Sequence, residues 1–270
     1  MPEGARVYIA ALPNKPVDGQ VEAASRLRGI GLEPVPHLVA RSFASPEDLD
    51  RLLGQLVEGA AIERALVLGG DRDDPAGNMT SALDIIRTGL LEDHGIRRIS
   101  IGCYPEGHPR ISDEELRRAL HEKLEAADKA GLETILVSQF CFDPNAILNF
   151  VRDLRADGIN TPIRIGVAGP AKAATLIKYA MICGVGPSLR ALKERQSLAR
   201  NLLGAVTPED ILRDVAVARE REPELRIWGI HFFTFAALRK SIEWAEERID
   251  RSKDPDAVPD DVFAENSEKP

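Results

Sequence analysis

Short runs of β-branched and aromatic residues recur along this 270-residue chain at intervals of roughly thirty residues, the length of a strand–helix–strand unit. Amphipathic stretches between the runs predict helices, and two of these start on a capping residue followed by acids, Ser45-Pro46-Glu47-Asp48 and Ser112-Asp113-Glu114-Glu115. Strands that alternate with helices are typical of a parallel sheet. The predicted strands are VYIAAL (7–12), PVPHLVA (34–40), ALVLGG (65–70), ISIGCY (99–104), TILVSQF (134–140), IRIGVA (163–168) and RIWGIHFFTF (226–235), and the predicted helices are 18–29, 46–59, 80–91, 113–130, 144–157 and 171–183.

The strands are continuously apolar, as expected when helices cover both faces of a sheet, so the chain is an open doubly wound sheet or a (β/α)₈ barrel. No G-x-G-x-x-G follows the first strand, which removes the usual dinucleotide signature of the open sheet. Unusual polar residues also end successive strands, at the position of a barrel's catalytic mouth. They are His37, Asp71, Tyr104 with His108, Gln139 and Thr234. We therefore predict an α/β fold, a (β/α)₈ TIM barrel.

The predicted barrel is one strand short. Between 168 and 226 the chain holds helices and a weak Gly-Val-Gly-Pro segment at 184–187. Because an unclosed barrel exposes unpaired backbone, we expect the seam to be covered by 184–189, by a second copy or partner chain, or by residues that precede this N-terminus. We predict one barrel domain over 1–250 and an acidic, proline-punctuated, disordered tail over 251–270.

Composition excludes several classes of function. The formal charge of −8 and pI near 5.3 argue against binding to nucleic acid or to an anionic membrane. No apolar run approaches the roughly 18 residues that span a bilayer, and the N-terminus lacks the pattern of a secretory signal. The three cysteines are widely separated and show no metal-ligand spacing. We expect a cytoplasmic protein with reduced thiols and no metal.

Five motifs, in order and on successive strands, resemble those of the methylenetetrahydrofolate reductases, TIM-barrel flavoenzymes of one-carbon metabolism and methionine biosynthesis. They are PHLVAR (36–41), VLGGDRDDPAG (67–77), CYPEGHP (103–109), SQFCFD (138–143) and HFFTF (231–235), and the resemblance runs from roughly residue 7 to 245. It implies an oxidoreductase that interconverts 5,10-methylene- and 5-methyl-tetrahydrofolate. It also implies bound FAD, NADH or NADPH as electron donor, a reduced folate as substrate, and ping-pong kinetics.

The resemblance assigns roles to Asp71, Gly70 and His37. Asp71 matches the aspartate that hydrogen-bonds the pterin and influences the charge of the flavin, and it is our catalytic candidate. Gly70 belongs to the Gly-Gly pair that allows close backbone approach to a flat ring. His37 matches a flavin contact. The structural alternatives are a turn or helix cap for Asp71 and a satisfied core histidine for His37.

Further along the chain, Tyr104 and His108 match residues that contact the isoalloxazine and ribityl parts of FAD. Gln139 can both donate and accept hydrogen bonds, which suits the amide-like edge of a pterin. Phe140 is a candidate for stacking on the substrate, and packing is its alternative role. Glu106 matches no family catalyst, and we expect it to be a surface residue.

Three features differ from the family pattern. The family's opening strand and the general acid on it, a glutamate, have no counterpart, because VYIAALPNK matches the second strand. The resemblance therefore predicts a barrel whose first strand is missing or replaced. Either the start lies too far downstream or the protein works without that acid. Gly69 replaces an arginine, and Ala127 replaces a lysine near the FAD diphosphate.

These differences leave other functions open. One is a flavin-independent version of the same reaction. Another is a non-catalytic folate- or flavin-binding protein, or a subunit that needs a partner. A third is a barrel enzyme that binds phosphorylated substrates at Gly169-Pro170-Ala171-Lys172.

Overall fold

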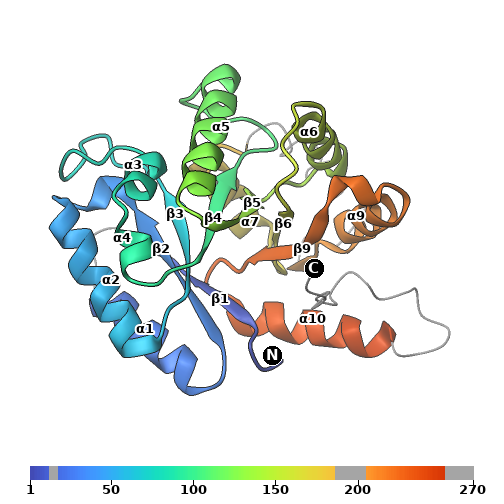
Figure 1. Ribbon diagram of the computed structural model, residues 1–270. Coiled ribbons are helices and arrows are strands. Elements are labelled where there is room, and N and C mark those ends of the chain that lie inside the picture. The colour runs from blue at the N-terminus through green and yellow to red at the C-terminus, as the bar shows by residue number, and fades with distance from the viewer. Residues whose placement is uncertain (12–17, 186–204, 253–270) are drawn as a thin grey trace. The chain divides into compact units, whose positions relative to one another are not determined.

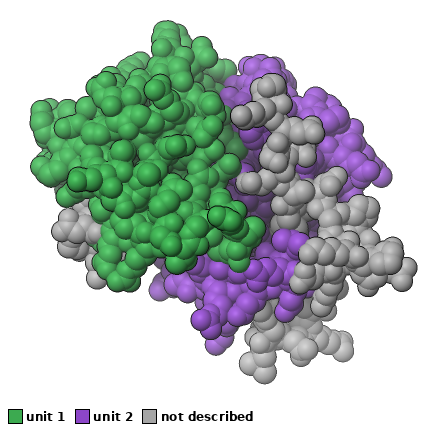
Figure 2. Space-filling model, turned by 60° about the horizontal axis from the view of Figure 1, so that its bottom comes forward, with its two compact units in different colours: residues 1–102, 117–136 green, residues 103–116, 137–270 purple. Residues whose placement is uncertain are grey.

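The computed structural model describes residues 1–11, 18–185 and 205–252 (Figure 1). The chain divides into two compact units, which are coloured separately in Figure 2. Unit 1 comprises Met1–Gly102 and Arg117–Leu136, and unit 2 comprises Cys103–Leu116 and Val137–Pro270. We describe each unit by itself, and the assignment of 1–250 to one domain stays a prediction. The predicted tail, from 253 onward, lies outside the described residues.

All seven predicted strands and most predicted helices are confirmed. The strands of the main sheet are β1 (Arg6–Ile9), β2 (Glu33–Val39), β3 (Arg64–Leu68), β4 (Arg98–Cys103), β5 (Glu133–Ser138), β6 (Ile163–Ala168) and β9 (Ile227–Phe233). The helices are α1 (Asp18–Gly29), α2 (Pro46–Ala60), α3 (Ala82–Arg87), α4 (Leu90–Asp93), α5 (Asp113–Lys129), α6 (Pro144–Ala156), α7 (Ala173–Ile182), α9 (Glu209–Arg221) and α10 (Leu238–Ser252). Two 3₁₀ helices, η1 (Ala40–Ser42) and η2 (Pro223–Leu225), and a small antiparallel pair, β7 (Ala171–Lys172) with β8 (Ala205–Val206), complete the described elements.

The main sheet keeps its strands in chain order, β1-β2-β3-β4-β5-β6-β9. The pairs β1–β2, β2–β3, β3–β4 and β6–β9 are parallel. A doubly wound sheet reverses its strand order at a switch point, whereas this order runs in one direction, as in a (β/α)₈ barrel. The fold is therefore α/β and TIM-barrel-like, with seven strands in the main sheet among the described residues. Residues 186–187 of the weak 184–187 segment lie outside them, and the covering of the seam stays a prediction.

One predicted helix is divided into two helices in the structure. The stretch 80–91 forms α3 and α4, which are separated by Thr88 and Gly89. Gly89 has φ of 77°, a left-handed conformation that ends a helix and that glycine adopts at little cost. The start of α3 carries a reciprocal cap, in which Ser81 Oγ accepts from the Asp84 amide and the Asp84 carboxylate accepts from the Ser81 amide.

Unit 1 has an apolar helix-packed core and a charged layer at the amino-terminal ends of its strands. The buried face of α2 carries Leu49, Leu52, Leu53, Leu56 and Ala60. In the charged layer, the Glu33 carboxylate lies between Arg6, at 3.0 Å, and Arg64, at 2.5 Å. Burial lowers the pKa of Arg64, and the positive charge of Arg6 adds to this, while Glu33 opposes it. The amino-terminal ends are thus closed by ion pairs, away from the carboxyl ends where the candidate residues lie.

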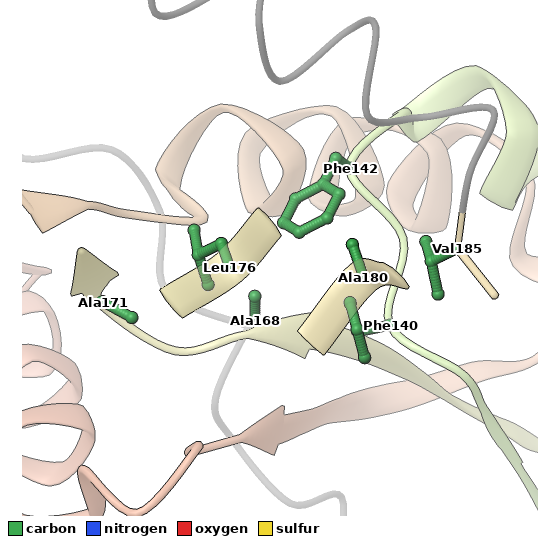
Figure 3. Packing of buried hydrophobic residues seen from close by; sticks show 7 residues of the cluster. All are labelled: Phe140, Phe142, Ala168, Ala171, Leu176, Ala180 and Val185. Atoms are coloured by element: carbon green, nitrogen blue, oxygen red, sulfur yellow. The ribbon is translucent and has the colours of Figure 1, made fainter. Parts of the chain in front are cut away.

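Unit 2 packs a cluster of buried apolar residues around the segment that follows β5 (Figure 3). Its members are Phe140, Phe142, Ala168, Ala171, Leu176, Ala180 and Val185. Phe140 is 1% exposed, and the centroid of its ring lies 5.7 Å from the ring centroid of Phe142 and 5.2 Å from that of Phe233. Packing is therefore an established role of Phe140, and its stacking on a substrate stays a prediction. None of the described helices is long and apolar enough to cross a membrane.

Candidate functional site

In unit 1 the candidate residues stand at the carboxyl ends of β2 and β3. Gly69, Gly70 and Asp71 follow the last residue of β3, and Asp71 is exposed. Gly70 has φ of 102°, and a Cβ at this position would lie 2.5 Å from Cγ1 of Val39. Only glycine fits there, because both the backbone conformation and the space exclude a side chain. The sharp turn at Gly70 directs the chain out of the sheet just before Asp71.

The loop after Asp71 is tightly packed against the segment that follows β2. The Ala76 amide donates to the Arg41 carbonyl at 2.9 Å. A Cβ on Gly77 would lie 2.0 Å from the carbonyl oxygen of Ala44, so the two backbones touch at Gly77. The loop that carries Asp71 is therefore held by backbone contacts at Ala76 and Gly77, and the contact at Gly77 is possible only because glycine has no side chain.

His37 is an uncharged imidazole inside unit 1. Burial lowers its pKa from 6.5 to about 4. Its ring meets that of Tyr8 edge to face, with centroids 6.2 Å apart, and the Tyr8 hydroxyl shares a 3.0 Å hydrogen bond with Ser100. The buried Nε2 of His37 has no hydrogen-bond partner among the described residues. It is thus not the satisfied core histidine of the structural alternative, and an unpaired ring nitrogen of this kind fits a ligand contact.

The lowered pKa of His37 predicts that the free energy of unfolding decreases in acid. Because the folded pKa lies below the unfolded value, the unfolded chain binds the extra proton first, and stability falls as the pH drops from 6.5 towards 4. At pH 5 the loss attributable to His37 is about 2 kcal/mol. We expect urea unfolding at pH 7 and pH 5 to show a smaller acid loss in His37→Asn than in the parent. His121→Asn, on the exposed part of α5, is the control. An equal loss in all three proteins would contradict this reading of His37.

In unit 2 the segment after β4 forms a compact turn. The Gly107 amide donates to the Tyr104 carbonyl at 3.1 Å, with Pro105 second and Gly107, at φ of 74°, fourth in the turn. The rings of Tyr104 and His108 consequently meet edge to face, with centroids 5.3 Å apart. Nδ1 of His108 accepts from the Arg110 amide at 3.2 Å. The turn brings these two candidates together, and Glu106 lies half-buried between them.

Gln139 follows the last residue of β5 and is half-buried. Its backbone N–H donates to the Cys103 carbonyl at 2.8 Å, which places Gln139 beside the end of β4. Its side-chain oxygen accepts from the Phe140 amide at 3.1 Å. This contact uses one of the two lone pairs of the side-chain oxygen. Gln139 can therefore still accept one hydrogen bond from a ligand and donate from its NH₂ group.

The backbone beneath Gln139 is fixed by a buried hydroxyl. Ser138, 1% exposed, donates to the Gln139 carbonyl at 3.1 Å and accepts from the Gly166 amide of β6 at 2.8 Å. A Cβ on Gly166 would lie 2.1 Å from the Ser138 carbonyl oxygen. The end of β5 and the middle of β6 therefore approach as closely as glycine allows.

The end of β9 adds an aromatic group that the sequence analysis did not identify. Phe235 and Ala236 have φ of 45° and 63°, a left-handed conformation that is costly for residues other than glycine. The ring of Phe235 stacks on that of Tyr179 from α7, with centroids 4.5 Å apart. Thr234, the predicted strand-end residue, immediately precedes this pair. The dense aromatics of HFFTF were the available signal, but the strain could not be read from them.

The two positions matched to cations of the family, Gly69 and Ala127, carry no charge. Ala127 is fully buried in α5, so its position faces the core of unit 1. Lys129 is paired with Glu125 at 2.6 Å. Gly69 has no side chain to offer. Among the described residues, no group of three histidine, cysteine or acidic side chains has the arrangement of a metal site.

Unit 1 also forms a pocket of about 360 Å³ beside the starts of α2 and α3. Its lining residues are Ala44, Ser45, Pro46, Asn78, Met79, Asp84, Arg87 and Thr88. None of the candidate site residues lines it.

The candidates thus form two sets, His37, Gly70 and Asp71 in unit 1, and Tyr104, His108, Gln139 and Phe140 in unit 2. That both sets face one cavity stays a prediction. The sequential strand order defines a TIM-barrel-like protein with polar and aromatic residues after its strands. A family model described as methylenetetrahydrofolate reductase matches residues 17–238. The chain belongs to the methylenetetrahydrofolate reductase family.

The individual relatives that match the chain have low sequence identity to it. The chain is 24% identical over 232 residues to methylenetetrahydrofolate reductase (NADH) 1 of Arabidopsis thaliana, covering 80% of this chain and 35% of that protein. It is 31% identical over 153 residues to a probable methylenetetrahydrofolate reductase (NADPH) of Caenorhabditis elegans, covering 54% of this chain and 22% of that protein. The chain therefore spans about a third or less of the length of these relatives.

A solved structure supports the fold alone. The triclinic crystal form of 2,3-dimethylmalate lyase, a member of the PEP mutase/isocitrate lyase superfamily, matches with a TM-score of 0.50 and 13% identity. The match covers 96% of this chain and 77% of the lyase.

Proposed function

We propose that the protein is an oxidoreductase that interconverts 5,10-methylenetetrahydrofolate and 5-methyltetrahydrofolate with NADH or NADPH. The observation that carries the proposal is the family match over 17–238, which contains Asp71 and Gln139 at the ends of β3 and β5. Its relatives are named for both nicotinamides, so the donor is left as either.

The chain's own residues would orient the folate and stabilise charge. The NH₂ group of Gln139 would donate to a carbonyl oxygen of the pterin, and its side-chain oxygen keeps a second lone pair beside the bond from the Phe140 amide. The carboxylate of Asp71 stands exposed after β3 and would hold the pterin while it favours positive charge on the reacting ring system. Asp71 is thus the proposed catalytic residue.

FAD is the proposed cofactor, and it would accept a hydride from the nicotinamide and pass it to the folate. The buried Nε2 of His37, unpaired within the described part of the chain, fits a contact with the flavin ring, and the edge-to-face rings of Tyr104 and His108 suit the flavin and its ribityl chain. Gly70 is proposed to lie beside the ring as the matched glycine of the Gly-Gly pair, although the space of its missing side chain is taken by Val39.

Direct hydride transfer from nicotinamide to folate, without flavin, is the second candidate. The observation in its favour is that two positions matched to cations of the family hold none here. Gly69 has no side chain, and Ala127 is an uncharged, buried residue.

A visible spectrum of the purified protein separates the two candidates. With bound FAD, we expect a yellow protein that NADH or NADPH bleaches and that methylenetetrahydrofolate reoxidises. A colourless protein that still turns over supports the flavin-independent reaction. Folate binding by calorimetry without turnover would select a binding protein or a subunit that needs a partner, and would contradict both candidates.

Gln139→Ala tests the substrate contact. Loss of one hydrogen bond at the end of β5 should raise the KM for the folate about tenfold, with kcat and any flavin spectrum little changed. Steady-state kinetics with varied folate provides the measurement. Gln55→Ala, on the exposed face of α2, is the matched control. An unchanged KM would remove Gln139 from the site.

A further inference from the structure

Arg41 lies in η1, directly after β2, and its side chain reaches the loop that carries Asp71. Its Nε donates to the Thr80 carbonyl at 3.0 Å, and its Nη1 donates to the Arg72 carbonyl at 2.7 Å. A longer contact of 3.5 Å joins Nη1 to the Asp73 carbonyl. The guanidinium thus binds the loop both just after Asp71 and at its far end.

The backbone of Arg41 binds the same loop. Its amide donates to the Gly69 carbonyl at 3.0 Å, and its carbonyl accepts from the Ala76 amide at 2.9 Å. One residue therefore contacts the loop before Asp71, after it and beyond its midpoint. The loop between 69 and 80 contains no helix or strand that would order it otherwise.

The chemistry of these contacts suits arginine alone. A guanidinium presents five N–H donors in a rigid planar fork, so it can bind carbonyls on both sides of a loop at once. Lysine has one nitrogen at the end of a flexible chain and cannot span both carbonyls. At these positions Arg41 serves as a brace for the loop, and most of its donors point at backbone oxygens.

We propose that Arg41 is a positioning residue, which holds the 69–80 loop so that the Asp71 carboxylate stays at the reacting ring. This inference rests on the proposed function, in which Asp71 touches the folate. Arg41 itself would contact neither substrate nor cofactor. From the sequence alone, Arg41 is either a spare cation for the FAD diphosphate or a solvated surface residue, because every atom that it binds comes from a distant part of the chain.

A double-mutant cycle on the full chain tests the proposal. The proteins are the parent, Arg41→Ala, Asp71→Asn and the double variant, with Arg41→Lys as the charge-retaining substitution. We expect Arg41→Ala to lower kcat about a hundredfold, because small misplacement of a catalytic group costs about that much. Arg41→Lys should restore little of it. In the Asp71→Asn background, Arg41→Ala should cause almost no further loss, since it acts through Asp71.

Equal losses in both backgrounds would overturn the proposal, as would a loss confined to the KM for the nicotinamide, which would mark Arg41 as an anion contact. Arg26→Ala is the matched control, because Arg26 is exposed on α1 and pairs only with the nearby Glu22 among the described residues. It should leave kcat unchanged.

Hydrogen exchange measured by mass spectrometry distinguishes a failure of the Arg41 proposal from a failure of the proposed function. Arg41→Ala should speed the exchange of amides in 71–80 while those of α2 keep the rate of the parent. If the parent shows no turnover, the proposed function fails, and faster exchange still supports the brace. Unchanged exchange in the loop overturns the brace whatever the activity.

Discussion

Asp71→Asn should lower turnover of the folate about a hundredfold and leave the unfolding transition nearly unchanged. The substitution keeps the size and shape of the side chain but removes its negative charge from beside the proposed position of the reacting rings, where preorganised charge has its largest effect. The described backbone contacts of the loop are made by Arg41, Ala76 and the close approach of Gly77 to Ala44, and the substitution alters none of these groups.

Steady-state kinetics with thermal unfolding gives the answer. Asp74→Asn is the control, because this residue is an exposed acid of the same loop. If Asp71→Asn lowers the unfolding temperature sharply while activity per folded molecule stays at the parental value, Asp71 has a structural role and the proposed site is misplaced.

Gly166→Ala should destabilise the protein by about 3 kcal/mol. The new methyl carbon would lie 2.1 Å from the Ser138 carbonyl oxygen and 2.9 Å from the Gln139 carbonyl carbon. Both are backbone atoms, which cannot swing aside as a flexible side chain can. The strands must separate, and the buried Ser138 hydroxyl then loses its bond from the Gly166 amide.

The midpoint and slope of urea unfolding measure this effect. Gly19→Ala in α1 is the control, because a Cβ there meets no atom within 4 Å. We expect the control to be neutral or slightly more stable. A Gly166→Ala protein with the parental midpoint would show that β5 and β6 are not as close as the Ser138 contacts require. In surviving folded protein, a raised KM for the folate would show that Gln139 has moved with β5.

Much of the fold could be predicted from local patterns. The apolar runs and their helical spacers predicted every strand of the main sheet, since a buried strand needs a continuous apolar run whatever its neighbours are. The barrel-like order followed from polar residues at successive strand ends. The single helix expected at 80–91 failed at Gly89, because one left-handed residue outweighs the helical pattern around it.

The candidate site was less predictable. The motifs identified Asp71 and Gln139, but not that the Gln139 oxygen is already engaged by the Phe140 amide. The strained Phe235 and its stacking on Tyr179 likewise depend on contacts between β9 and α7, which no spacing along the chain encodes.

The amino-acid sequence by itself determined the alternation of strands and helices and the family of the chain, because these depend on residue types at short separations. Only the tertiary structure decided the surroundings of His37 and Arg41. Burial by surrounding elements keeps the His37 imidazole neutral. The carbonyls that Arg41 binds come from 31 and 39 residues further along the chain, and folding alone brings them within reach of its guanidinium.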